Sequence, residues 1–247
     1  MYYSQFGEDR ILDKLFGGKS TGSCVEVGAN DGVNDSTTFY FEQRGWRCIL
    51  IEPNPDLCRA IASTRTARLF PCAASDAEGV ATLHVAEGAG RAHGVSGLGS
   101  AEESHRRITG YGFAVRPIEV RTRPLDAVLA EAGLQEGQID FISIDVEGHE
   151  LQVLKGLSID RWKPAVLIAE DNSRFQDLSV VRHLRSFGYV PFKRTGVNDW
   201  FAHQSNTRLV SRVGRLSWHF AALNALARAR LRKIPGLLAL RSALLGR

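Results

Sequence analysis

Four short runs of apolar residues each end at acidic side chains. The runs are Cys24–Val27, Cys48–Ile51, Phe141–Ile144 and Ala165–Ala169. Runs of this kind are typical of parallel strands that are covered by helices on both faces. In such sheets ligands bind outside the carboxyl ends of the strands. The pattern therefore predicts an α/β fold whose binding site is lined by carboxylates.

The first apolar run leads into a loop with two glycines, Gly28 and Gly32. A strand that ends in Gly-x-x-x-Gly lets the backbone approach a ligand without an intervening Cβ. A dinucleotide-binding loop carries a third glycine and no acids, whereas this loop holds Glu26 and Asp31. Two carboxylates repel a pyrophosphate and suit a cationic cofactor. S-adenosylmethionine is the common cofactor of that kind, and we expect Glu26 to face it.

The second apolar run ends at Glu52, which follows Gly28 by 24 residues. That interval carries a βαβ unit through one helix and back to the neighbouring strand, so Glu52 is placed to accept both ribose hydroxyls of an adenosine. Small residues at positions 73–76 predict a close approach of the adenine ring to the backbone.

The third run leads directly into a helix through Asp145, and His149 follows four positions later. A neutral imidazole at the mouth of the site is a candidate general base. Glu147 and Glu150 are interpreted as acids that favour the start of a helix. The other histidines lack an acidic partner pattern and are interpreted as structural or surface residues.

Charge is unevenly distributed along the chain, which holds 31 basic and 27 acidic residues. Nine of the basic residues lie beyond Asp199, the last acid, so residues 1–199 keep 22 basic residues and a net charge of −5. An acidic body argues against a nucleic-acid enzyme, whose binding face needs clustered basic residues.

The division of charge predicts one domain over residues 1–205 and a basic tail over residues 206–247. The tail pattern predicts two amphipathic helices separated at residues 234–236 by Ile-Pro-Gly. Two interpretations remain open for these helices. They pack on the body or on a second copy, which would form a homo-oligomer, or they contact an anionic membrane surface peripherally. In the second case the substrate would be a glycolipid.

The four cysteines show no Cys-x-x-Cys spacing, so we expect neither zinc nor disulfides. The first residues lack the pattern of a secretory signal, and we expect a cytoplasmic protein. The glycine-rich segment 88–99 is predicted to be a substrate loop.

Several motifs resemble those of one known family over roughly residues 2–172. They are Ser4–Asp9, Val25–Gly32, Ile51–Pro53 and Ile144–Glu150. Together they resemble the FkbM-type S-adenosylmethionine-dependent methyltransferases. The resemblance implies a Rossmann-like class I methyltransferase fold, with a seven-stranded, mostly parallel sheet and helices on both faces. It also implies methyl transfer to oxygen, on a sugar, an oligosaccharide or a glycosylated natural product. The cofactor-binding residues that it implies are Gln5, Gly28, Asn30, Ser36, Glu52 and Ala73.

The chain departs from the commoner family pattern after the fifth strand, where Glu170 and Asp171 replace a lone acid. With Asp145, this pair resembles the metal site of magnesium-dependent sugar O-methyltransferases. Hard cations such as Mg²⁺ bind oxygen ligands. We therefore expect Asp145, Glu170 and Asp171 to hold a divalent metal, with Asp145 and His149 as the catalytic residues.

Two alternatives belong to other classes. A nicotinamide-dependent oxidoreductase would use the same sheet, but the chain lacks the third glycine and any Tyr-x-x-x-Lys pair. A non-catalytic cofactor-binding scaffold would use the basic tail as an anchor. Cofactor calorimetry tests the first alternative, and methyl transfer to any acceptor excludes the second.

Overall fold

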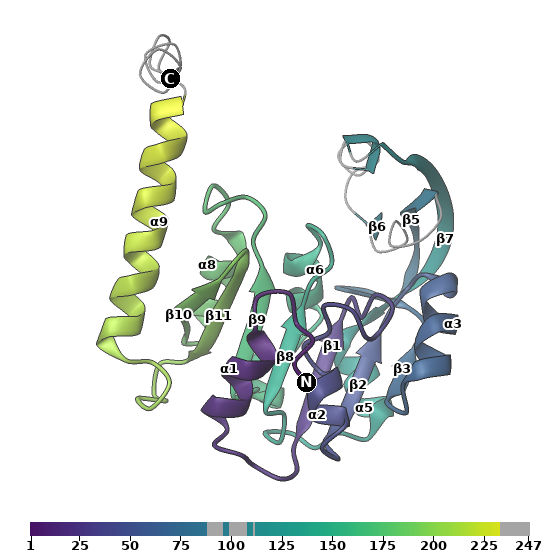
Figure 1. Cartoon of the computed structure of the whole chain (residues 1–247), viewed down its shortest axis with the longest axis horizontal. Helices are drawn as coiled ribbons and strands as arrows, with labels where there is room; N and C mark the ends of the chain where they lie inside the picture. Colours follow the sequence, from purple (N-terminus) through teal and green to yellow (C-terminus); the bar gives the residue numbers. More distant parts are fainter. Residues whose placement is uncertain (88–95, 99–107, 111, 233–247) are drawn as a thin grey trace.

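The computed structural model describes residues 1–87, 96–98, 108–110 and 112–232, and its main sheet has seven strands in the order β10-β11-β9-β8-β1-β2-β3 (Figure 1). Only β11 runs against its neighbours β9 and β10; the other pairs are parallel. The prediction of a seven-stranded, mostly parallel sheet is thus confirmed. The strands are β1 (Ser23–Val27), β2 (Arg47–Ile51), β3 (Arg68–Phe70), β8 (Phe141–Ile144), β9 (Val166–Glu170), β10 (Tyr189–Thr195) and β11 (Asn198–His203).

The four apolar runs form the centre of this sheet, as β2, β1, β8 and β9. The register aligns Val27 with Ile51 on one side and with Ile144 on the other. Because these residues end their strands side by side, the chain that follows each of them emerges at the same edge of the sheet. This alignment brings the glycine loop, Glu52 and Asp145 together.

Helices cover both faces because alternate strand residues point to opposite sides. On β1, for example, Cys24 packs in one apolar cluster and Val25 in the other. One face is covered by α1 (Glu8–Leu15), α2 (Phe39–Glu42) and α3 (Pro55–Thr64). The other face is covered by α5 (Leu125–Ala132), α6 (Glu150–Lys155), α7 (Ile159–Trp162) and α8 (Ser179–Ser186).

A second sheet stands beside the carboxyl edge of the first, and its strand order is β4-β7-β5-β6 (Figure 1). Its strands are β4 (Ala73–Ser75), β5 (Gly79–Glu87), β6 (Ser96–Gly97) and β7 (Ala114–Pro124). Three of the small residues at 73–76 form β4, which pairs in parallel with β7. That partner lies almost 50 residues away, so local sequence could not reveal it. The predicted substrate loop at 88–99 lies outside the described residues except at 96–98.

The tail begins with one long helix, α9 (Arg212–Arg232), which stands at the edge of the molecule beside β10 (Figure 1). Its buried Trp218 donates a hydrogen bond from Nε1 to Asp199 Oδ1 at 2.7 Å and meets the ring of Phe175 edge-on. The predicted break at residues 234–236 lies outside the described part of the chain. Over the described residues, no helix has the length and apolar character needed to cross a membrane.

Candidate active site

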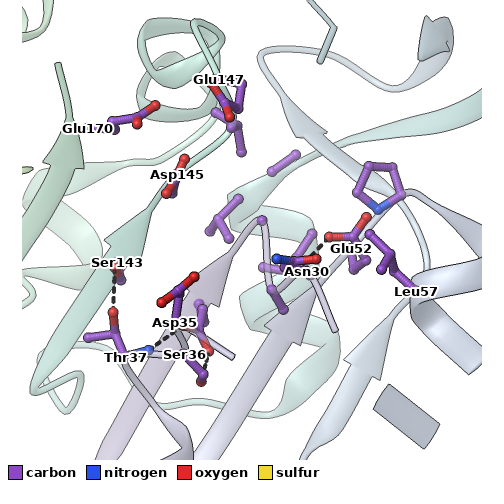
Figure 2. A pocket seen from close by; sticks show the side chains of 18 of the residues that line it. Asn30, Asp35, Ser36, Thr37, Glu52, Leu57, Ser143, Asp145, Glu147 and Glu170 are labelled. Carbon is purple, nitrogen blue, oxygen red and sulfur yellow. Dashed lines mark hydrogen bonds between the residues drawn. The ribbon is translucent and has the colours of Figure 1, made fainter. Parts of the chain in front are cut away.

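A cavity of about 330 Å³ opens at the carboxyl edge of the main sheet, between the ends of β1, β2, β8 and β9 and the second sheet (Figure 2). Carboxylates dominate its polar lining, and no described lining residue is Lys, Arg or His. A lining with several acids and no basic residue among its described members gives the cavity a negative potential that attracts a cationic ligand. The acids are Glu8, Glu26, Asp35, Glu52, Asp145, Glu147 and Glu170.

Gly28 is required by the close approach of two strand ends. Its φ is +83°, and a Cβ at this position would lie 1.8 Å from the carbonyl oxygen of Asp145. Its N–H donates to the carbonyl of Ile51 at 2.9 Å. This N–H is therefore used between β1 and β2, and Gly28 lines the cavity.

Glu52 lies at the cavity wall, and its side chain is held by two backbone groups. Asn30 N–H donates to Oε2 at 3.0 Å, and Asn54 N–H donates to Oε1 at 2.8 Å. Burial raises the pKa of Glu52 to about 7, although both hydrogen bonds act to lower it. Each carboxylate oxygen keeps a free lone-pair direction, which a ribose hydroxyl can use. The role of Glu52 toward the ribose stays a prediction, and the structure gives Asn30 a role in orienting the Glu52 carboxylate.

Glu26 is buried beneath the loop that follows β1, and its oxygens are occupied by that loop. They accept hydrogen bonds from Ser36 Oγ at 2.8 Å, Thr37 N–H at 2.6 Å and Thr38 Oγ1 at 2.5 Å. Burial raises the pKa of Glu26, and these bonds oppose the rise. Glu26 therefore anchors the cavity wall from inside, and Ser36 lines the cavity as the partner of Glu26.

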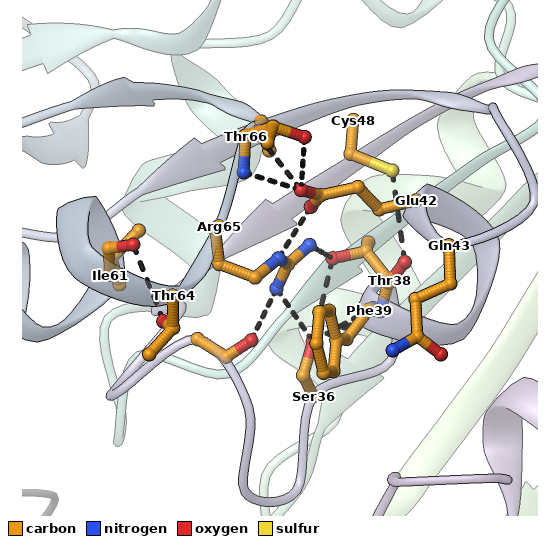
Figure 3. A network of polar contacts seen from close by, with 12 residues as sticks. Ser36, Thr38, Phe39, Glu42, Gln43, Cys48, Ile61, Thr64, Arg65 and Thr66 are labelled. Carbon is orange, nitrogen blue, oxygen red and sulfur yellow. Dashed lines mark hydrogen bonds and ion pairs between the residues drawn. The ribbon is translucent and has the colours of Figure 1, made fainter.

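The same loop is held from its other side by Arg65, whose side chain is fully buried (Figure 3). Its guanidinium donates to the carbonyl of Gly32 and, at 3.1 Å, to Thr38 Oγ1. Its Nε donates to Glu42 at 2.5 Å. Arg65 thus connects α2, the end of α3 and the loop that follows β1 in one buried network. This loop, residues 28–38, is called the cofactor loop below. Arg65 is a residue of this network that was not predicted, because nothing in its neighbours along the chain indicates a buried arginine.

The N-terminal segment lies over the mouth of the cavity because Ser4 forms a parallel bridge with Asp35. This contact brings Gln5 to the cavity wall, where it was predicted, and it also brings Glu8. Glu8 accepts hydrogen bonds from Thr195 Oγ1 at 2.6 Å and from Asn198 Nδ2 at 3.0 Å. Glu8 belongs to the Ser4–Asp9 motif, which was the available signal for this residue. Ala73 also lines the cavity, and its predicted contact with the cofactor stays a prediction.

Asp145 and Glu170 project from the ends of β8 and β9 into the cavity (Figure 2). Desolvation, followed by the negative charges of Glu147 and Glu150, raises the pKa of Asp145 to about 7. Desolvation and the nearby Asp145 raise the pKa of Glu170 to about 10. Since two neighbouring carboxylates resist ionising together, the pair holds a proton at neutral pH.

Asp171 does not join these two acids. Its Oδ2 pairs with Arg194 at 2.9 Å and accepts from Phe175 N–H, while Oδ1 accepts from Ser173 N–H at 2.9 Å. Arg194 also pairs with Asp199 at 3.0 Å, the acid that receives Trp218 of α9. Both oxygens of Asp171 are therefore occupied by a structural cluster at the sheet edge. The predicted three-acid metal site is not assembled, and the described residues contain no group of three metal-binding side chains.

His149 precedes α6 and points toward the second sheet, where its Nε2 lies 3.0 Å from Ser75 Oγ. Burial lowers its pKa, and the charge of Asp76 opposes this change. A neutral ring was expected, but His149 does not line the cavity. Glu147, which was interpreted as a helix-start acid, does line it, on a backbone with a φ of +56°.

A comparison with models of known protein families identifies the family of this chain. A family model described as "Methyltransferase FkbM domain" matches residues 26–191, about two thirds of the chain. The chain belongs to the FkbM methyltransferase family. The matched span contains the whole cofactor loop, Glu52 and the Asp145–Glu170 pair. Membership of this family identifies the chain as a methyltransferase that uses S-adenosylmethionine. It argues against the alternative of a nicotinamide-dependent oxidoreductase. None of the curated proteins compared matches the chain significantly.

Solved structures similar to this chain share little sequence with it. A precorrin-6y C5,15-methyltransferase from Geobacter metallireducens is 9% identical, covers 78% of this chain and 84% of its own, and has a TM-score of 0.39. TrmK of M. capricolum, solved with S-adenosylhomocysteine, is 10% identical and has a TM-score of 0.40. The match covers 92% of this chain and 87% of TrmK. A precorrin-8w decarboxylase from Methanobacterium thermoautotrophicum is 15% identical and has a TM-score of 0.36. The match covers 78% of this chain and 86% of the decarboxylase.

The cavity fits S-adenosylmethionine on its own chemistry. Glu52 offers two carboxylate oxygens to ribose hydroxyls, and Ala73 and Leu57 provide apolar wall. The acids around them suit the ammonium and sulfonium charges. The residues that would hold the cofactor are therefore those at the ends of β1 and β2.

Proposed function

We propose that this enzyme transfers a methyl group from S-adenosylmethionine to a hydroxyl oxygen of a saccharide or a glycosylated natural product. The observation that carries the proposal is the pair of cavity carboxyls, Asp145 and Glu170, with the pKa of Asp145 near neutrality. The bound cofactor supplies an activated methyl group on a sulfonium. The remaining tasks for the protein are to align the hydroxyl and to accept its proton.

Asp145 is the proposed proton acceptor. A carboxyl group with a pKa of about 7 is ionised in a large fraction of molecules at neutral pH and is a stronger base than an ordinary aspartate. Glu170, with its pKa raised further, keeps its proton and can donate a hydrogen bond to the acceptor or to Asp145. When the hydroxyl oxygen bonds to the methyl carbon, the carbon–sulfur bond breaks and the hydroxyl proton passes to Asp145.

The acceptor class follows from the charge and polarity of the cavity. A lining of carboxylates and amides offers many hydrogen-bond acceptors to neutral hydroxyls, as Asn198 and Glu147 do beside the pair. The same lining repels a phosphate or carboxylate acceptor. An uncharged sugar agrees with both features and with the resemblance of the sequence to enzymes that act on sugars.

The proposed reaction uses no step through a metal, because Asp171 is bound to Arg194 and is not available beside Asp145. It also assigns no proton to His149, because this ring contacts Ser75 outside the cavity lining. Both earlier expectations, a magnesium ion and a histidine base, have measurable consequences and are tested together with Asp145.

The test compares Asp145→Asn with His149→Ala in methyl-transfer assays against cell-extracted glycans with labelled cofactor. We expect Asp145→Asn to lose about two or more orders of magnitude in rate, as for a lost general base, and to bind cofactor with little change by calorimetry. We expect His149→Ala to keep most of its rate. Exhaustive dialysis against EDTA should leave wild-type turnover intact.

The opposite pattern would overturn the assignment. A His149→Ala variant that binds cofactor but loses two orders of magnitude would restore the histidine base. Turnover that disappears with EDTA and returns with magnesium would restore the metal. Methylation of phosphorylated or carboxylate acceptors in preference to neutral glycans would remove the saccharide hydroxyl from the proposal.

A further inference from the structure

The helix α9 has two distinct faces. Its inner face packs on the body through the buried Trp218 and through Ala221, Ala222 and Ala225, which are half-buried against the main core. The hydrogen bond from Trp218 to Asp199 fixes the rotation of the helix about its axis. The side of α9 that faces away from the body is therefore a defined surface and cannot turn inward.

That outer face carries four large apolar side chains: Val213, Leu216, Phe220 and Leu223. They are 76%, 57%, 63% and 63% exposed, respectively. Their spacing of three, four and three residues aligns them in one stripe along the helix. They are half of the large hydrophobic side chains that are exposed in the described part of the chain. Such a concentration on one helix face marks a contact surface.

The charge around this outer face has one sign. Arg212 and Arg215 are exposed within the same turns of α9, and no acidic residue follows Asp199 in the sequence. Residues 1–199, which form the body behind the helix, carry a net charge of −5. The molecule therefore presents a basic, apolar helix on one edge and an acidic catalytic body behind it.

We propose that the outer face of α9 docks on the surface of an anionic lipid bilayer, with the helix axis in the plane of the surface. An interfacial helix of this kind inserts its apolar stripe at the boundary between headgroups and acyl chains, and its arginines remain at the level of the phosphates. Anionic lipid complements both properties of the face. A second copy of the chain, paired through the same face, would instead place two basic helices against each other, and neither carries an acidic residue to balance the charge.

The test is co-sedimentation of the full chain with vesicles of phosphatidylcholine alone and with vesicles that contain about 30% phosphatidylglycerol. We expect binding to the anionic vesicles, weak binding to the neutral ones, and a marked loss of binding as salt screens the charges. Apolar insertion is tested by Phe220→Ser with Leu223→Ser, which should weaken binding at least tenfold. The matched control is Val80→Ser, since Val80 is 66% exposed on β5 and should not affect binding.

The charge is tested by Arg212→Gln with Arg215→Gln, which should weaken binding about fivefold for each arginine removed. The control is Arg182→Gln, a change of an arginine on α8 that is also exposed. Cofactor affinity by calorimetry should be unchanged in all variants, because none lies in the cavity, and this readout shows that each variant is folded.

Three results would overturn the proposal. The first is recovery of the full chain entirely in the supernatant with anionic vesicles. The second is a loss of binding in the Val80 and Arg182 controls as large as that in the α9 variants. In the third, sedimentation velocity would find a stable dimer that Phe220→Ser with Leu223→Ser separates into monomers, while no variant binds vesicles. The outer face would then be a subunit interface.

Discussion

At Glu52, burial and two hydrogen bonds act in opposite directions on one carboxyl group. Burial prevails and raises its pKa to about 7. Between about pH 4.5 and 7 the folded chain therefore keeps a proton that the unfolded chain releases. Stability falls wherever the folded state binds more protons as pH rises, so this group reduces the stability of the cofactor-free enzyme as pH rises through that window.

We therefore predict that the free energy of unfolding of Glu52→Gln rises relative to that of the wild type as pH increases from 5 to 8. The relative gain over this range is up to about 3 kcal/mol. The same change should weaken cofactor binding by about 1.5 to 3 kcal/mol at pH 8, the range for lost charge-assisted hydrogen bonds. Urea unfolding at the two pH values and calorimetry measure these effects. Parallel pH profiles for the two proteins, or unchanged cofactor affinity, would contradict the role given to Glu52.

Gly28 allows a test of the close approach between β1 and β8. Alanine at a positive φ costs about 1 to 2 kcal/mol at any site. At Gly28 its Cβ would also overlap the carbonyl of Asp145, whereas at Gly45, with a φ of +82°, it would meet nothing within 4 Å. We predict that Gly45→Ala folds with a loss of about 1 to 2 kcal/mol and that Gly28→Ala loses more than about 4 kcal/mol or gives no cooperative transition. Equal losses in thermal unfolding would contradict the overlap.

At the scale of elements, the cofactor loop depends on α2 and α3 through Arg65. Removing one member of a buried ion pair leaves its partner charge unpaired and costs about 3 to 5 kcal/mol. We predict a loss of this size in the free energy of unfolding for Arg65→Met, together with weaker cofactor binding, because the loop loses its outer support. The control is Arg59→Met on the same helix, where the arginine is 73% exposed and its pair with Asp56 contributes little. If both variants unfold alike, Arg65 does not stabilise the loop.

The strands of the main sheet were predictable because each is a short apolar run bounded by turn-forming or acidic residues. The helix after the glycine loop was less predictable. Asp35, Ser36 and Thr37 are residues of the kind that cap a helix, but α2 extends only from Phe39 to Glu42. The hydroxyls of Ser36 and Thr38 bind Glu26 instead of serving only the helix terminus, and this competition shortens the helix.

At the scale of the whole molecule, α9 is attached to the body by one face and exposed on the other, so two aromatic residues two positions apart should behave differently. We predict that Trp218→Ala lowers the free energy of unfolding by about 3 to 5 kcal/mol, because it opens a cavity and leaves Asp199 without its donor. Phe220→Ala should stay within about 0.5 kcal/mol of the wild type. Denaturant unfolding measures both, and a comparable loss in the two variants would contradict the two-faced description of α9.

The sequence by itself determined the properties that depend on neighbouring residues. Apolar runs specified the central strands, and strand direction placed Glu52 and Asp145 at one edge. The motifs indicated the family to which the chain belongs, and the distribution of charge separated an acidic body from a basic tail. These features could be predicted because they rest on local periodicity and on the common carboxyl edge of parallel strands.

The tertiary structure alone decided which polar groups meet. Asp171 is adjacent to Glu170 in sequence, yet it pairs with Arg194, because alternate residues at the end of a strand point to different sides. His149 follows Asp145 by four residues and still reaches Ser75, which is 74 residues away in the chain. The partner of a charged side chain depends on distances between remote segments, and no spacing along a single sequence encodes those distances.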